Sequence, residues 1–163
     1  MEKPLFQNSL YEFVLLKEPN ALVFNWKDET RSMTYDDFQE ACGNYAGFVI
    51  EYHTANLIVN SKEFHFELPE KYRAWKNENL NPRYAKAGVS KQAFVMRTKD
   101  YELFKQEEVQ DEGYVNRYFD TQEQAVTWLN ADLWRIIKTT YYERHLKETL
   151  TLSKSSFPNF KIN

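Results

Sequence analysis

The run Glu63-Phe64-His65-Phe66-Glu67 is the stretch of this sequence whose residue types could do chemistry. In an extended chain, alternation places Glu63, His65 and Glu67 on one side and both phenylalanines on the other. Two carboxylates and an imidazole can bind a divalent metal or act as an acid–base pair. Three side chains two residues apart on one strand rarely converge on one point, however. The pattern therefore favours a surface loop whose phenylalanines pack on the core and whose His65 is solvated, with no catalytic residue and no metal ligand.

Aromatic and basic side chains gather directly after this run. Tyrosine, tryptophan and arginine are the residue types that anchor protein interfaces. One interpretation is an interaction surface, and the alternative places Tyr72 and Trp75 in the core with the charges solvating the outer face. The residues of this candidate surface are Phe66, Tyr72, Arg73, Trp75, Lys76, Arg83 and Tyr84.

The single cysteine and the few glycines exclude several kinds of site. One cysteine, Cys42, rules out an internal disulfide and a multi-cysteine metal centre. It lies in a helical stripe of apolar residues, which predicts a small core residue rather than a reactive thiol. Four glycines form no phosphate-binding loop, so we predict no cofactor. Gly43 and Gly47 fall inside the same helix, where we interpret them as sites of tight packing on the sheet or, alternatively, of close approach by a ligand.

Composition bounds the class of protein. A chain of 163 residues fits one domain, and 17% aromatic residues predict a core rich in rings. The net charge of -3 argues against a general nucleic-acid binder. No run approaches the 18 or so apolar residues of a membrane span. Without features of a secretion signal at the start, we expect a cytoplasmic location.

The elements that must position these residues follow from hydrophobic periodicity. Residues 10–17 and Ala21–Trp26 predict a β-hairpin around Glu18-Pro19-Asn20. Thr34 and Asp37 then form a capping box for a helix. The apolar face of that helix is Tyr35, Phe38, Cys42, Tyr45, Ala46 and Val49.

Strands and helices alternate after the hairpin. We expect strands at Asn56–Asn60, 92–97 and Tyr114–Phe119. We expect a helix that begins at Pro69 and breaks before Pro82, with a short continuation that ends at Gly88. Further helices are expected over 100–110 and from Thr121. The order ββαβαβαβα predicts an α/β fold with a mixed, mostly parallel sheet of about five strands packed by helices.

This order resembles the STAS domains, the fold of bacterial anti-anti-sigma factors, and is most similar to their SpoIIAA-like or STAS/CRAL-TRIO-like bacterial branch. The stretches that carry the resemblance are Leu57-Ile58-Val59-Asn60, Pro82 to Val89 leading into Ala93-Phe94-Val95-Met96, and Tyr118-Phe119-Asp120 with Glu123, Ala125, Trp128 and Leu129. Anti-anti-sigma members carry a phosphorylated serine in an Asp-Ser-Ser-Gly-like turn. The matching Glu67-Leu68-Pro69-Glu70 has no hydroxyl, so the resemblance implies no phosphorylation cycle here; Ser61 is the nearest hydroxyl.

The end of the chain exceeds what such a domain needs. We expect a domain over 1–133 and a helical extension with a loose, basic tail over 134–163. Trp134, Ile137 and Tyr141 are helically spaced, which predicts contacts in a homodimer.

The sequence is consistent with two functions. The first is a non-enzymatic regulatory or protein-interaction module of STAS type, which lacks the phosphorylatable serine and takes a protein partner or a second copy. The alternative is a carrier or sensor of an apolar or anionic small molecule, which the ring-rich core and the CRAL-TRIO-like resemblance favour. A pocket lined by the rings would favour the carrier, and a flat surface with exposed Tyr72 and Trp75 the interaction module.

Overall fold

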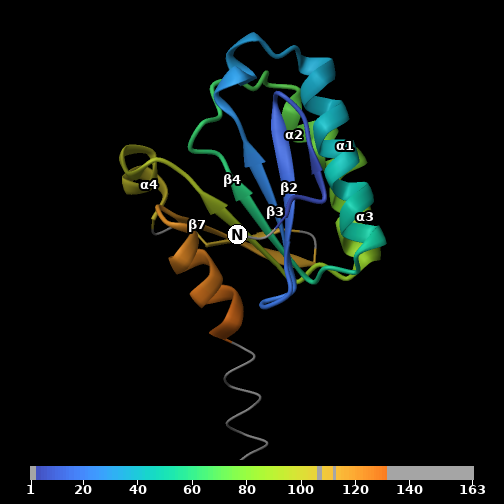
Figure 1. The fold of residues 1–163 in the computed structure, drawn as a ribbon, viewed down its shortest axis with the longest axis vertical. Coiled ribbons are helices and arrows are strands. Elements are labelled where there is room, and N and C mark those ends of the chain that lie inside the picture. The colour runs from blue at the N-terminus through green and yellow to red at the C-terminus, as the bar shows by residue number, and fades with distance from the viewer. Residues whose placement is uncertain (1–2, 106–107, 112, 132–163) are drawn as a thin grey trace, which may run out of the picture. The chain divides into compact units, whose positions relative to one another are not determined.

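A seven-stranded mixed sheet is the central layer of the computed structural model, which describes residues 3–105, 108–111 and 113–131 (Figure 1). In chain order the strands are β1 (Phe6–Gln7), β2 (Tyr11–Leu16), β3 (Ala21–Trp26), β4 (Asn56–Asn60), β5 (Lys91–Val95), β6 (Glu108–Asp111) and β7 (Tyr114–Phe119). The helices are the 3-10 helix η1 (Asp28–Ser32), α1 (Tyr35–Glu51), α2 (Tyr72–Asn79), α3 (Asn81–Ala87) and α4 (Thr98–Phe104), followed by a helix over 122–131.

The sheet combines an antiparallel hairpin with parallel strands, as predicted. Its strand order is β1-β2-β3-β4-β5-β7-β6. β2 and β3 pair antiparallel, and Asn20 in their connecting turn adopts the left-handed conformation at φ 57°. β3, β4, β5 and β7 run parallel to one another. The α/β fold class is thereby confirmed, with short strands β1 and β6 added at the two edges.

The region after α4 corrects one prediction. The expected helix over 100–110 ends at Phe104, and β6 pairs antiparallel with β7 from Glu108↔Arg117 to Asp111↔Tyr114. Gly113, at φ 87°, closes this hairpin rather than a helix. A glycine at positive φ suits a tight hairpin turn, and pairing with the edge of β7 satisfies the backbone groups of the segment.

The helices begin and end largely where their capping residues predict. Thr34 Oγ1 accepts the Asp37 N–H at 3.2 Å, and Asp37 Oδ2 accepts the Thr34 N–H at 2.8 Å, which completes the capping box of α1. Pro82 lies in the first turn of α3, and Gly88 ends it at φ 77°. α2 begins at Tyr72, three residues later than expected from Pro69.

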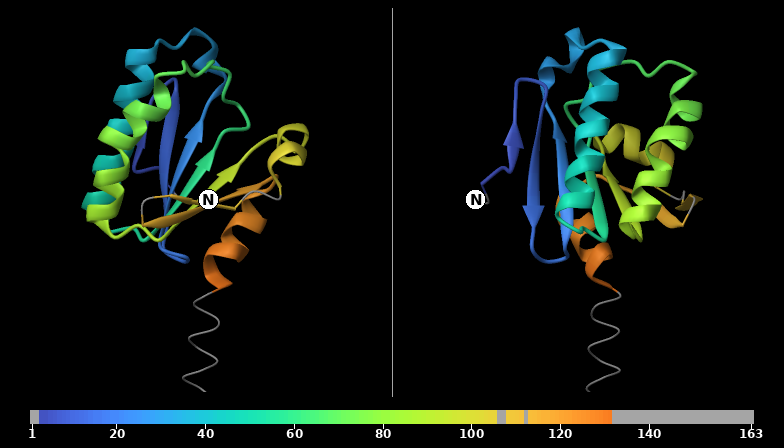
Figure 2. Two further views of the ribbon diagram at one scale, coloured as in Figure 1. Left: turned by 180° about the vertical axis from the view of Figure 1, so that it is seen from behind. Right: turned by 90° about the vertical axis from the view of Figure 1, so that its right-hand side faces the viewer.

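Helices cover both faces of the sheet (Figure 2). Alternate strand residues, such as Leu22 and Phe24 in β3, pack with α1 and α3 in one core of buried residues. Their neighbours Ala21 and Val23 belong to a second core with Ala125 and Leu129 of the helix over 122–131. The first core is rich in rings, as predicted; its buried rings include Tyr11, Phe13, Phe24, Trp26, Phe38, Tyr45, Tyr84 and Tyr114.

Residues Met1–Leu129 form one compact unit of the chain. The predicted extension and tail over 134–163, with the predicted dimer contacts Trp134, Ile137 and Tyr141, lie outside the described residues. Within the described residues, no helix has the length and apolar character needed to cross a membrane.

Candidate functional site

A pocket of about 210 Å³ lies between the sheet and the helical layer of α1, α2 and α3. The sheet side of the pocket is formed by residues in the second halves of β3, β4 and β5 or just after these strands. Gln92, near the start of β5, also lines it. In open α/β sheets, ligands bind at the carboxyl ends of the strands. The residues that line it are Phe24, Trp26, Phe38, Cys42, Tyr45, Val59, Ser61, Phe64, Leu68, Tyr72, Lys76, Leu80, Tyr84, Gln92 and Phe94.

Aromatic rings make up about half of this lining. Phe64, from the loop after β4, lies 5.0 Å from Trp26 between ring centroids. On the helical side, Phe38 meets Tyr72 edge to face at 5.4 Å. Leu68 is the exposed residue of the lining, at 38%, and it places the mouth of the pocket at the loop over 61–68. The pocket is thus an apolar, ring-lined space with one open side.

Most polar groups of the lining are engaged within the protein. The Tyr45 hydroxyl donates to the Leu22 carbonyl at 2.6 Å, and the Ser61 hydroxyl donates to the Val95 carbonyl at 3.1 Å. Burial raises the pKa of the Cys42 thiol far above its usual value, so this thiol stays protonated and unreactive, as predicted. The Gln92 side chain is buried, at 4% exposure, and its Oε1 has no hydrogen-bond partner among the described residues.

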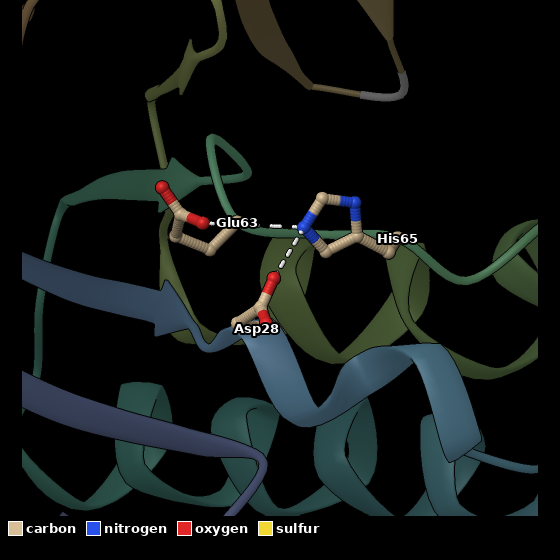
Figure 3. A group of neighbouring side chains, drawn as sticks. All are labelled: Asp28, Glu63 and His65. Carbon is tan, nitrogen blue, oxygen red and sulfur yellow. Dashed lines mark ion pairs between the residues drawn. The ribbon is translucent and has the colours of Figure 1, made fainter.

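The loop over 61–68 also contains the run Glu63 to Glu67, and the structure brings Glu63 and His65 of this run together with Asp28 of η1 (Figure 3). His65 Nε2 lies 2.8 Å from Asp28 Oδ1 and 3.9 Å from Glu63 Oε2. The three ligand atoms lie within 4.8 Å of one another. Asp28 comes from η1, which directly follows β3, so two segments far apart in the sequence build this cluster.

One prediction about this loop is confirmed, and another is wrong. Phe64 and Phe66 pack against the first core, as predicted. The prediction that His65 is solvated is wrong, because its side chain is only 17% exposed. Asp28 covers the ring, and the loop backbone is held to the buried Thr30. Glu67, placed on the same side by alternation, is exposed and does not belong to the cluster in the described part of the chain.

An arginine already occupies the neighbourhood of the cluster. Arg31 Nη2 lies 3.2 Å from Asp28 Oδ1 and 3.2 Å from His65 Nε2. Its hydrogen bond is the main cause that lowers the pKa of the Asp28 carboxyl, with further contributions from the charges of Arg31 and His65. Arg31, Asp28 and His65 therefore form a polar network that links η1 to the loop over 61–68.

The residues of the candidate interaction surface do not stay together. Phe66, Tyr72 and Trp75 are half-buried and pack against the first core, while Tyr84 is buried at 3% exposure. Arg73 alone of the set is exposed. Of the two remaining members, Lys76 lines the pocket and Arg83 lies where α3 contacts α1.

The sequence interpretation missed two residues of the site. Gln92 was assigned only to a buried strand, although a glutamine at a core-facing strand position is a polar group in need of a partner. Asp28 gave no signal, because Glu63 and His65, with which it forms the cluster, lie more than thirty residues away along the chain. No family model, curated protein or solved structure matches the chain.

Proposed function

We propose that this domain binds a small, largely apolar molecule in the pocket between the sheet and α1–α3. The observation that carries the proposal is the ring-lined space at the carboxyl ends of β3, β4 and β5. Ligand pockets are concave, mostly apolar and lined by aromatic residues, with a few polar groups that orient the ligand. The proposal corresponds to the carrier or sensor predicted as the alternative function.

The size of the pocket sets the size of the ligand. A volume of about 210 Å³ suits a molecule of one or two fused rings, since a cavity of roughly 150 Å³ in another protein holds benzene. Access runs past Leu68 and Phe64 on the loop over 61–68. A ligand of this size would contact rings from both the sheet and the helices.

The interaction module and the similarity to STAS domains stay predictions. Tyr72 and Trp75 pack against Phe38, at 5.4 and 6.2 Å between ring centroids. The apolar area that they offer to a protein partner is reduced accordingly. The packing supports the alternative interpretation of these two residues as members of the core.

The test combines native mass spectrometry with a titration. The full chain, purified gently from its own host, is examined for a bound small molecule that is lost on denaturation. The purified protein is then titrated with indole and naphthalene, with calorimetry and thermal unfolding as readouts. We expect a copurified molecule or a saturable rise in Tm with these ring probes.

A pair of variants localises the binding. Val59 of β4 lines the pocket, whereas Val14 is half-buried on β2, two strands away, and packs against the second core. Val59→Phe should fill the space and weaken probe binding about tenfold or more, and Val14→Phe should leave it unchanged. A chain that carries no molecule and whose Tm responds to neither probe would refute the proposal.

A further inference from the structure

We infer that Asp28, Glu63 and His65 form a binding site for a divalent transition-metal ion, of which Zn²⁺ is the best fit. The site lies where η1 meets the loop over 61–68 (Figure 3). None of the three residues lines the ring pocket, so the inference goes beyond the proposed function and does not depend on it. It departs from the sequence-based prediction of no metal ligand, because Asp28 joins the cluster from another segment.

The three ligand atoms converge on one point. His65 Nε2 lies 2.8 Å from Asp28 Oδ1 and 3.9 Å from Glu63 Oε2, and all three atoms lie within 4.8 Å of one another. Zinc bonds of about 2.0–2.2 Å place neighbouring ligand atoms of a tetrahedral site roughly 3.4 Å apart. The two measured separations lie on either side of that value. Small rotations of the two carboxylates, whose side chains are each 62% exposed, bring the atoms to bonding distance of one ion.

A buried hydroxyl holds the backbone that carries the ligands. Thr30 Oγ1 accepts the His65 N–H at 3.0 Å and donates to the Glu63 carbonyl at 3.1 Å. Thr30 is fully buried and lies in η1, two residues after Asp28. The three ligand residues therefore belong to one short hydrogen-bonded unit. A ligand set that is positioned in advance loses less conformational entropy when it binds.

The residue types favour a transition metal over Mg²⁺ or Ca²⁺. Imidazole nitrogen suits zinc, copper and nickel, whereas Mg²⁺ and Ca²⁺ take six or more oxygen ligands. The charges of Asp28 and Glu63 balance a divalent ion, so that His65 binds as the neutral imidazole. Three protein ligands leave at least one coordination position for water.

Arg31 is the group that a metal ion must displace. Its Nη2 lies 3.2 Å from both Asp28 Oδ1 and His65 Nε2. His65 Nε2 can donate to Asp28 or accept from Arg31 but cannot do both, so one of these close contacts is not a hydrogen bond in any protonation state. The Arg31 side chain is 65% exposed, and exposed ion pairs contribute little to stability. The guanidinium can therefore turn into solvent at little cost.

The experiment titrates the full chain, purified without a histidine tag, with Zn²⁺ and with Mg²⁺ by calorimetry at neutral pH. We expect one Zn²⁺ site with a Kd on the order of 10 µM, weaker than a structural site with four ligands. Mg²⁺ should not bind measurably. NMR of the ¹⁵N-labelled chain locates the ion, because the sequence has three histidines and the ring signals of His65 should shift.

Variants of similar shape assign the ligands. His65→Asn, Asp28→Asn and Glu63→Gln should each weaken Zn²⁺ binding about tenfold or more. Glu29→Gln is the matched control, since it removes the same charge from η1 outside the cluster. His53→Asn removes an exposed histidine, and asparagine tolerates its φ of 50°. Both controls should bind Zn²⁺ like the unaltered chain.

Removal of the competing arginine should have the opposite effect. Arg31→Gln should bind Zn²⁺ about three- to tenfold more tightly, because it removes both the competitor for Asp28 and a nearby positive charge. Arg73→Gln, at an exposed position of α2, removes the same charge elsewhere and should leave the affinity unchanged. A network that only links η1 to the loop predicts no such gain.

Three results would each overturn the inference. They are no Zn²⁺ binding up to about 1 mM, NMR shifts confined to the other two histidines, and an affinity that is unchanged in His65→Asn. The NMR titration of the unaltered chain decides the matter even if a variant does not fold. The ring-probe titrations test the proposed function separately, so either proposal can fail while the other stands.

Discussion

The hydroxyl of Thr30 accepts the backbone N–H of His65 at 3.0 Å, thirty-five positions further along the chain. The same hydroxyl donates to the carbonyl of Glu63 at 3.1 Å. Thr30 is fully buried, so these two hydrogen bonds are shielded from water. They fix the segment that turns Phe64 into the pocket and presents His65 to Asp28.

Replacing Thr30 with valine should destabilise the protein by about 1–3 kcal/mol. Valine has nearly the same shape, but it leaves the His65 N–H and the Glu63 carbonyl without their buried partner. The measurement is urea unfolding followed by circular dichroism. Since the loop also lines the pocket, binding of the ring probes should weaken in parallel.

A neighbouring hydroxyl provides the control for Thr30. Ser32 lies at the end of the same 3-10 helix, but it is exposed and donates only to the Glu29 carbonyl. Ser32→Ala should change the free energy of unfolding by no more than about 0.5 kcal/mol. Similar losses in both variants would mean that the link between η1 and the loop contributes nothing specific.

Replacing Gly43 or Gly47 with alanine should stabilise the protein by about 0.5–1 kcal/mol each. A Cβ at either position would meet the Arg83 guanidinium at 3.8 Å, an ordinary contact. These glycines therefore face α3, and the interpretation that tight packing on the sheet requires them is wrong. Thermal unfolding of each variant gives the sign directly.

Gly88 is the matched case in which alanine should destabilise. It ends α3 at φ 77°, where a side chain is strained even though nothing lies within 4 Å of its Cβ. Gly88→Ala should cost about 1 kcal/mol, and Gly88→Asn less, because asparagine tolerates this conformation better. A stabilising Gly88→Ala together with a destabilising Gly43→Ala would contradict the account of both sites.

Local signals predicted the framework of the fold well. The Thr34 capping box, the Asn20 turn and the Gly88 helix end each depend on a few consecutive residues, and each occurs where expected. The predicted helix over 100–110 was wrong beyond Phe104, because Glu108–Asp111 pairs with β7, a partner that the segment's own residues do not reveal. Tertiary pairing there outweighs the local helical pattern.

The candidate site was less predictable, because contacts across the fold build it. The alternation in residues 63–67 correctly separated Phe64 from Glu63 and His65, but Asp28 and Thr30 complete that cluster from another segment. Gln92 carried a usable signal, a polar residue on the inner face of a strand. Its lack of a partner became visible only once the neighbouring side chains were in place.

The Thr34–Asp37 capping box should make part of the stability depend on acid pH. Hydrogen bonds from the Thr34 side chain and backbone hold the pKa of the Asp37 carboxyl below 3.8. A lowered folded-state pKa means that this stabilisation is present above pH 3.8 and is lost as the pH falls through the folded value. Thr34→Ala should cost about 1 kcal/mol at neutral pH, measured by urea unfolding.

The difference between Thr34→Ala and the unaltered protein should narrow as the pH falls below 3.8. Thr34→Ala keeps the backbone N–H that donates to Asp37 but loses the hydroxyl that donates to Asp37 Oδ2 at 2.6 Å. Protonation of Asp37 weakens this hydroxyl hydrogen bond in the unaltered protein alone, because the variant no longer has it. A difference that is constant from neutral pH to pH 3 would contradict a role for the ionised carboxylate.

Cys42 should report on opening of the pocket. It is the only cysteine, it lines the pocket, and its thiol is buried with a raised pKa. A thiol-specific reagent such as Ellman's should react with the folded protein on the order of a thousandfold more slowly than with the urea-unfolded chain, because reaction needs an exposed thiolate. Cys42→Ala gives the blank.

The pH dependence and the ring probes sharpen this prediction. The unfolded thiol ionises near its ordinary value of 9.0 while the folded thiol stays protonated, so its contribution favours folding below pH 9.0 and declines as the pH rises above it. Saturating indole should slow the labelling of the folded chain further, since the ligand would lie against Cys42. Labelling of the folded protein as fast as the unfolded chain would show that the wall of the pocket beside α1 is open to solvent.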